Sequence, residues 1–485
     1  MIKYCQDIIK MKNKVRTAIV TAAIGAIGST STSYAADWEI VPSLNIAEVY
    51  TDDVDLDSTF AQSDFVTQAT LGTSIITAGP RFNLNLNYGL TYLYYPGLEG
   101  DKDEFRHNLL ASSTAEVFRD FFFVDVNAGV TQQFVDRRAA FSTVSLVRTE
   151  NRATVAIADV SPYIVNRVGG NFSTLTTRYR YSYVNSSRNL TLAGDDLGGS
   201  SGTFHEASSI LASGTRFTKF TWNFTNVYRN ERSSNGLDNN VYTSTLLGDY
   251  QYTRQIAFIA SVGYAKRNSD FGGANFDGIT WRAGGRLTPG PRTIIQATYG
   301  KDFVGNTLNL NASYRITPAM TATLTFNDQY QSFQSLALDD LLDGTGTAGG
   351  VQQQTINDTF ARRQRWQSTL TGVRGRSTIT FDASHEKTTT DVADSTFVRK
   401  AVGVSWTRQL NPRASFTASA TLMEDDFLRD PEKDVFVAYN ARYDYNISAN
   451  IVGTLEYIHT KRRQVVFNYV PRESNFVSVA IGVTF

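Results

Sequence analysis

Charged side chains recur at every second position in several segments of this chain. Arg178 and Arg180 are separated by one residue, and Arg363 and Arg365 repeat the same spacing. A guanidinium group binds carboxylates, phosphates and hydroxyls through charge-assisted hydrogen bonds, and it breaks no covalent bond by itself. Residues i and i+2 lie on the same face of a β-strand. The spacing therefore predicts rows of binding groups along strands.

The same alternation places further charged residues on one face of their segments. A charged side chain that faces lipid near the middle of a membrane costs about 2–4 kcal/mol, so this face would line a wet interior. The candidates for that lining are Arg178, Arg180, Lys219, Arg282, Arg286, Arg315, Arg363, Arg365, Arg399, Arg442, Asp125, Asp249, Asp382, Glu386, Asp444 and Glu456. Because both signs occur in similar numbers, two interpretations stay open. The charges either guide an anionic or polar substrate, or they form a network that stiffens the wall.

One acidic segment partly matches a calcium-binding loop. In DVDLDSTFAQSD, the carboxylates of Asp53, Asp55, Asp57 and Asp64 stand at positions one, three, five and twelve. Ser58 occupies the position that normally needs glycine, and the last position lacks the long glutamate side chain. An acidic external loop beside lipopolysaccharide is the simpler interpretation of this segment.

The sequence offers little to an enzyme or a bound cofactor. The four histidines, at positions 107, 205, 385 and 459, have no metal-ligand spacing, and neither HExxH nor a P-loop occurs. We therefore predict no enzymatic activity, no cofactor and no metal.

The segments that would position the charged residues alternate strictly between apolar and polar. The chain ends in NFVSVAIGVTF, where Val477, Val479, Ile481, Val483 and Phe485 share one face. In RFNLNLNYGLTYLYY, leucines and tyrosines oppose asparagines in the same way. Two faces of such different polarity are typical of a transmembrane β-strand between lipid and water. These five alternating residues, from Val477 to Phe485, would form the lipid face of the closing strand. The terminal Phe resembles the signal recognised by the barrel-assembly machinery.

Short and long connections take turns between these segments. Clusters of Gly, Pro, Arg and Asn lie at 77–81, 118–120, 166–170, 213–216, 252–255, 288–292, 317–319, 373–377, 411–413 and 446–450, and longer acidic stretches separate them. This rhythm predicts an all-β fold, a single antiparallel up-and-down transmembrane barrel of about 22 strands (18–24), with short periplasmic turns and long extracellular loops.

The N-terminus predicts export. Lys10, Lys12, Lys14 and Arg16 precede an apolar run that is too short to span a membrane, followed by STSYAA, as in a signal peptide over residues 1–35 whose true start could be Met11. Removing it takes five basic residues and one acidic residue from 46 of each, leaving 41 and 45, and it removes Cys5. A nearly neutral chain gives no reason to expect nucleic acid as a partner. Residues 36–485 would form one barrel domain.

A barrel of 22 strands is wide. Strands about 4.8 Å apart and tilted by about 40° give a backbone diameter of roughly 44 Å. No plug domain is expected before the first strand, WEIVPSLNIAEVY. The long segment 331–358, with its SLALDDLL and glycine-rich parts, is predicted either to fold into the pore or to remain an extracellular surface loop.

The stretch WEIVPSLNIAEVYTDDVDLDS, followed by FVTQATLGTSIITAGPRFNLNLNYGLTYLYY, resembles the outer-membrane β-barrel family associated with exopolysaccharide and PEP-CTERM sorting systems. The resemblance covers about the first 60 residues after the signal peptide, and beyond them it is one of length and hairpin rhythm. It implies a role near polysaccharide export and assigns no active residue to this chain.

Together these patterns predict an outer-membrane channel or export component of a Gram-negative bacterium, with exopolysaccharide as substrate and a passive, charged lumen. The alternatives are a general or sugar-uptake porin, and a structural or adhesive surface barrel with a filled lumen. A TonB-dependent receptor is disfavoured by the missing plug and the short chain. Expected partners are outer-membrane lipid and lipopolysaccharide, the barrel-assembly machinery, the polysaccharide and a periplasmic export partner.

Overall fold

The computed structural model describes residues 37–55, 61–99, 102–134, 144, 146–149, 151–187, 200–234, 236, 238–270, 275–303, 305–332, 360–390, 396–427, 433–463 and 472–485. The predicted signal peptide, Asp57 and nearly all of the predicted loop 331–358 lie outside these residues. Among the described residues, no helix is long and apolar enough to cross a membrane.

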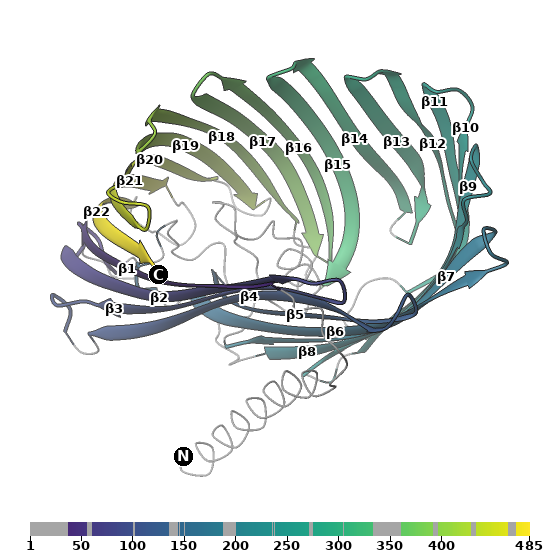
Figure 1. Ribbon diagram of the computed structural model, residues 1–485, viewed down its shortest axis with the longest axis horizontal. Helices are drawn as coiled ribbons and strands as arrows, with labels where there is room; N and C mark the ends of the chain where they lie inside the picture. The colour runs from purple at the N-terminus through teal and green to yellow at the C-terminus, as the bar shows by residue number, and fades with distance from the viewer. Residues whose placement is uncertain are drawn as a thin grey trace, which may run out of the picture.

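Twenty-two antiparallel strands form one sheet that closes on itself. Each strand is hydrogen-bonded to its neighbours in the chain, and the last strand pairs with the first from Ser43 with Thr484 to Thr51 with Phe476. Figure 1 shows this closure, with the yellow β22 beside the purple β1. The strands are β1 (Asp37–Thr51), β2 (Asp64–Ala78), β3 (Phe82–Tyr94), β4 (Asp103–Phe118), β5 (Phe122–Phe134), β6 (Arg152–Val168), β7 (Ser173–Ser186), β8 (Ser200–Ser213), β9 (Phe220–Ser233), β10 (Asp238–Gln251), β11 (Ile256–Ser269), β12 (Phe276–Gly290), β13 (Thr293–Asp302), β14 (Gly305–Thr317), β15 (Met320–Ser332), β16 (Phe360–Arg374), β17 (Ser377–Thr390), β18 (Thr396–Asn411), β19 (Ala414–Phe427), β20 (Asp434–Asn446), β21 (Ile451–Arg463) and β22 (Arg472–Thr484).

The predicted strand number and turn positions are confirmed. Ten short turns join β2 to β3, β4 to β5 and so on to β20 and β21, and each coincides with a cluster singled out in the sequence. The other end of the barrel carries the longer connections, which are extracellular in this architecture. One of them departs from the pattern: only residues 303 and 304 separate β13 from β14, and Gly305 adopts a φ of 99° there.

The outer surface of the sheet is apolar and exposed. On β22, Val477, Val479 and Ile481 are 41–58% exposed, while Phe476 and Ala480 on the opposite face are buried. Aromatic side chains gather towards both ends of the strands, as in the pairs Trp38 with Phe82 and Tyr50 with Phe65. These features make the outward face a lipid-facing band, as the alternation predicts.

A collar of polar residues surrounds the barrel just above this band. It comprises outward-facing lysines and histidines within a few residues of the long-loop ends of their strands: Lys266, Lys301, Lys387, Lys400, Lys461, His107, His205, His385 and His459. Tyrosine hydroxyls hydrogen-bond His107 and His205 at 2.8–2.9 Å. All five lysines that lie in strands point outwards, whereas the arginines of the inner wall point inwards.

Candidate luminal site

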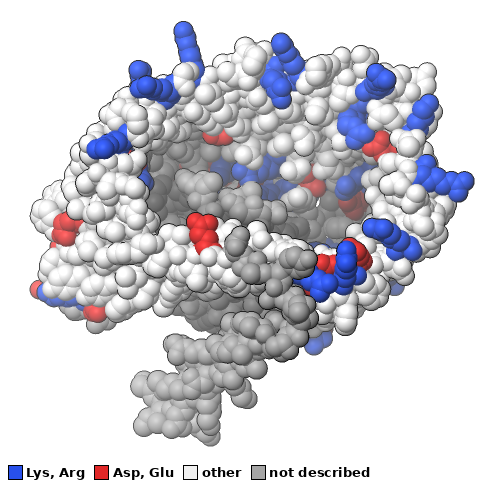
Figure 2. Space-filling model, viewed as in Figure 1, with Lys and Arg blue, Asp and Glu red and all other residues white. Residues whose placement is uncertain are grey.

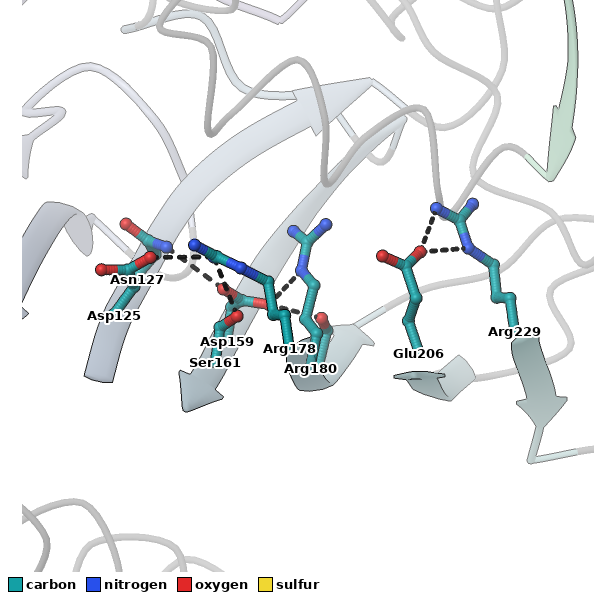
Figure 3. Close-up of polar contacts among 9 residues, drawn as sticks. Asp125, Asn127, Asp159, Ser161, Arg178, Arg180, Glu206 and Arg229 are labelled. Atoms are coloured by element: carbon teal, nitrogen blue, oxygen red, sulfur yellow. Dashed lines mark hydrogen bonds and ion pairs between the residues drawn. The ribbon is translucent and has the colours of Figure 1, made fainter. Parts of the chain in front are cut away.

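The inner wall of β5, β6 and β7 carries an ion pair beside an aromatic stack. Arg178 donates to the carboxylate of Asp125 at 2.8 Å and to Ser161 Oγ at 3.0 Å (Figure 3). Its guanidinium lies 4.1 Å from the ring centroid of Tyr163, which stacks on Phe123. The alternation predicted from the sequence places these side chains on one face, and the antiparallel register brings the three strands' contributions together.

A second pair lies one step closer to the long loops. Arg180 Nε is 2.5 Å from Asp159 Oδ2, and the same carboxylate accepts hydrogen bonds from Ser182 and Asn127. On the next two strands Glu206 accepts from Arg229 at 2.7 Å (Figure 3). Polar contacts thus run without interruption across the strands from β5 to β7 and continue on β8 and β9.

Similar pairs continue around the wall. They join Arg282 to Asp302, Arg286 to Asp249, Arg363 to Glu386, Arg399 to Asp425, Arg442 to Asp444 and Arg462 to Asp434, at distances between 2.6 and 3.1 Å. Arg365 lies 4.0 Å from Glu386. Most of the candidates from the sequence are therefore found in pairs.

Besides Arg365, four candidates form no close ion pair. Asp382 accepts from Thr369, Glu456 accepts from Asn440, and Arg315 has no side-chain partner among the described residues. Lys219 does not line the wall: it is exposed in the short turn between β8 and β9. The prediction took Lys219 as a strand residue, but β9 begins at Phe220, which is the first residue paired with β10 in the sheet register.

Several partners were missed from the sequence. Asp159, Glu206, Arg229, Asp302, Asp425, Asp434 and Arg462 all complete pairs on the wall. The same alternation rule would have found them, because each lies an even number of residues from an inward-facing neighbour. The rule does not give the register between strands, which decides which side chains are in contact.

The two members of each pair differ in exposure. The side chain of Arg178 is 34% exposed against 19% for Asp125, and Arg180 is 21% exposed against 2% for Asp159. The arginine is the more exposed partner in all nine close pairs named above. Short carboxylates lie against the strands, and the longer guanidinium side chains cover them. The wall thus presents donors to the lumen although its charges balance.

Comparison with known proteins shows which solved structures share this fold. No protein-family model matches this sequence, and no curated protein matches it. Among solved structures, the siderophore receptor PirA from Acinetobacter baumannii has a TM-score of 0.55 and 7% identity, over 93% of this chain and 81% of that one. The FrpB iron transporter from Neisseria meningitidis has 0.57 and 8%, over 92% and 81%. A mutant of the ferric enterobactin receptor PfeA from Pseudomonas aeruginosa, in complex with enterobactin, has 0.56 and 8%, over 93% and 82%.

A closed antiparallel β-sheet with an apolar outer band is the architecture of proteins that span the bacterial outer membrane. The chain is an outer-membrane β-barrel. The three similar structures named above are titled as receptors or transporters, and at such low identity they establish the fold alone.

Loops partly fill the long-loop end of the barrel beside the seam of β1 and β22. We call the segments 52–55, 95–98 and 146–149 the seam cap. Val54, Tyr95 and Val147 are fully buried there and pack against inward-facing residues such as Leu93 and Phe476. Although residues 146–149 follow β5, they lie over β1 to β3. This constriction was not foreseen, because the sequence pointed to residues 331–358.

Hydrogen bonds fix the seam cap. Tyr95 donates its hydroxyl to the carbonyl of Leu146 at 2.6 Å, and the amide of Arg148 donates to the carbonyl of Val54 at 3.0 Å. Asp53 is buried beside them, and its Oδ1 has no hydrogen-bond partner among the described residues. Burial raises the pKa of Asp53 to about 6, against the opposing effect of Arg472.

Of the four candidate calcium ligands, Asp57 lies outside the described residues, and Asp55 and Asp64 make contacts within the protein. Asp64 accepts hydrogen bonds from the amides of Phe65 and Gly97, and the backbone of Asp55 forms an isolated parallel β-bridge with that of Arg148. Over the described part of the chain, no group of three His, Cys, Asp or Glu side chains could hold a metal ion. The histidines lie on four separate strands of the outer collar.

Proposed function

We propose that this barrel is a passive channel for polysaccharide and acts as the outer-membrane component through which an exopolysaccharide is exported. The observation that carries the proposal is the layering of the wall, in which guanidinium groups cover carboxylates on strands from β5 to β21. A sugar chain that passes such a wall meets many weak hydrogen-bonding sites in series, and none of them holds it tightly.

Two further features support a channel for sugars. The stack of Phe123 and Tyr163 beside Arg178 offers an apolar ring face next to hydrogen-bond donors, a combination suited to a sugar ring. Transport is also what the titles of the similar structures describe, although their ligands are siderophores and iron. Export itself is supported only by the resemblance of the N-terminal stretch.

A structural or adhesive barrel with a filled lumen is the competing function. The pairing favours it, because Arg–carboxylate contacts across adjacent strands also stiffen a wall. A general or sugar-uptake porin shares the wall chemistry and differs in the direction and range of its substrates.

Single-channel conductance tests the proposal. The mature chain is refolded into a planar bilayer beside a variant that lacks residues 331–358 and a control that lacks residues 188–199. We expect a large, stable conductance from the mature chain, or one that appears only without residues 331–358, and reversible block by polysaccharide from the same organism. If all three proteins fold and none conducts, the channel is refuted and the filled barrel is favoured.

A further inference from the structure

The ten short turns are strongly basic. All of them lie within the described residues, and together they contain Arg81, Arg119, Arg216, Lys219, Arg254, Arg292, Arg376 and Arg413 but a single acidic residue, Asp120. In Figure 2, blue side chains stand around the rim where Figure 1 draws these turns, and few red ones lie among them. The short-turn rim is therefore a ring of positive charge.

The charges of the rim differ from those of the wall in having few partners. Arg119 is 3.7 Å from Asp120, and the guanidinium of Arg376 donates to a backbone carbonyl. The other basic side chains of the ten turns are exposed and form no ion pair within the described residues. The wall arginines named above are paired with carboxylates, whereas these side chains of the rim are not, so the rim carries uncompensated positive charge.

The connections at the long-loop end of the barrel carry the opposite net charge. The connections at the long-loop end contain 19 acidic and 7 basic residues in the sequence. A nearly neutral chain is thus divided into a basic end and an acidic end. Such a division acts on a charged polymer before contact, because the rim attracts it over roughly a Debye length of 8–10 Å.

The rim also leads into the wall. Arg286 and Arg442 point inwards four residues before the short-turn ends of β12 and β20, and Arg315 is exposed two residues before the end of β14. A polyanion that binds the rim therefore finds the first guanidinium groups of the lumen within about 15 Å of strand.

We propose that the short-turn rim captures an acidic polysaccharide from the periplasmic side, so that the substrate of the channel is a polyanion rich in carboxylates. This inference rests on the proposed function and names its substrate class. The basic residues occupy six separate turns around the mouth as well as the turn of Arg119. A flexible polymer that enters the mouth can reach all of them, whereas a folded partner would contact one side of the ring.

The test compares two variants that each lose six positive charges. The rim variant carries R81Q, R216Q, R254Q, R292Q, R376Q and R413Q. The collar variant carries K266Q, K301Q, K387Q, K400Q and K461Q in the collar and K433Q in the long connection just before β20, and these lysines lie near the long-loop end. Both variants and the mature chain are reconstituted in nanodiscs of zwitterionic lipid, which removes anionic lipid as a ligand. Heat-modifiable electrophoretic mobility establishes that each barrel is folded.

Equilibrium binding of polygalacturonate and of neutral dextran is then measured at 50 and 300 mM salt. We expect the mature chain to prefer polygalacturonate, the higher salt to weaken binding at least tenfold, and the rim variant to weaken it about tenfold at low salt. The collar variant should change binding by less than about threefold.

Equal loss in both variants, equal binding of dextran, or no binding of polygalacturonate would overturn the inference. So would a rim variant that binds polygalacturonate normally but has lost affinity only for an acidic protein or for anionic vesicles. Binding in nanodiscs needs no conduction. A barrel that binds polygalacturonate at the rim but conducts no ions would refute the channel and leave the rim assignment intact. A barrel that conducts ions but does not bind the polymer would refute the rim assignment and leave the channel intact.

Discussion

Residue by residue, the wall stabilises carboxylates that would be costly to leave alone. Asp159 is almost fully buried and depends on Arg180, Ser182 and Asn127 for its hydrogen bonds. A buried carboxylate without a counter-charge is strongly destabilising, whereas removing both charges is much less so. The pairs therefore contribute to stability through their mutual dependence, whatever passes through the lumen.

Replacing Arg180 by Gln should lower the free energy of unfolding by roughly 1–3 kcal/mol, because Asp159 keeps its charge and loses its main partner. Guanidinium unfolding in detergent micelles measures the change. The double variant R180Q/D159N should recover most of the loss. Equal stabilities of the single and double variants would contradict the coupling.

Asp53 should make the seam cap sensitive to pH. Its folded pKa of about 6 is above the ordinary value of 3.8, so the protonated form favours the folded cap. That contribution is complete below about pH 4 and is lost as the pH rises through 6. It amounts to at most about 3 kcal/mol. Asp52, Asp55 and Arg472 are the charged neighbours that act on it.

Hydrogen exchange at the amide of Arg148, which donates to Val54, measures this effect. We express the exchange rate of this amide relative to that of an unstructured reference peptide at the same pH. We expect this ratio to be higher at pH 8 than at pH 5, and D53N should abolish the difference. A pH dependence that survives in D53N would assign it to another group.

At the scale of elements, strand faces are the part of this protein that the sequence predicts best. Lipid and water impose a period of two on every strand, so the alternation in β3, β20 and β22 gives the facing of each residue without any knowledge of its neighbours. Turn residues then mark where each strand ends. Lys219 shows the limit of this prediction, because the turn between β8 and β9 has six residues and the sequence predicted four.

Changing Ile481 to Lys should cost about 2–4 kcal/mol, because Ile481 lies midway along the apolar band of β22 opposite Ile46 and Gly453. Ser478 points inwards on the same strand, near Glu456, so S478K is the matched control and should cost less than about 1 kcal/mol. Unfolding in micelles compares the two. The role of residues 477–485 in recognition by the barrel-assembly machinery stays a prediction.

Two inward-facing glycines should respond differently to Ala. A Cβ on Gly300 would lie 1.9 Å from the backbone oxygen of Trp281, whereas a Cβ on Gly403 would meet only atoms at 3.9 Å. We expect G300A to lower the free energy of unfolding by at least about 2 kcal/mol, because backbone would have to shift, and G403A to change it little. Comparable effects of both substitutions would show that the β12–β13 contact is less tight than described.

For the whole molecule, the number of strands and the ten turns follow from the sequence, while the filling of the mouth does not. The barrel closes because lipid leaves no sheet edge unpaired, a constraint that acts on any sequence with this alternation. The seam cap depends on contacts between residues far apart in the sequence, such as Tyr95 with Leu146, 51 positions apart, and Asp52 with Asn475, 423 positions apart. No local pattern encodes those contacts, so the sequence could suggest a constriction but could not identify the segment that forms it.

The outward position of every strand lysine also has a practical consequence. Primary amines in the collar face the surroundings of the barrel near the cell surface, whereas the guanidinium groups of the wall do not react with amine-specific reagents. An acylating dye that cannot cross membranes would therefore mark this protein on intact cells while leaving its inner wall chemically unchanged. Lys219, in a short turn, would become labelled only after the envelope is opened, and so would report the orientation of the barrel from a single peptide.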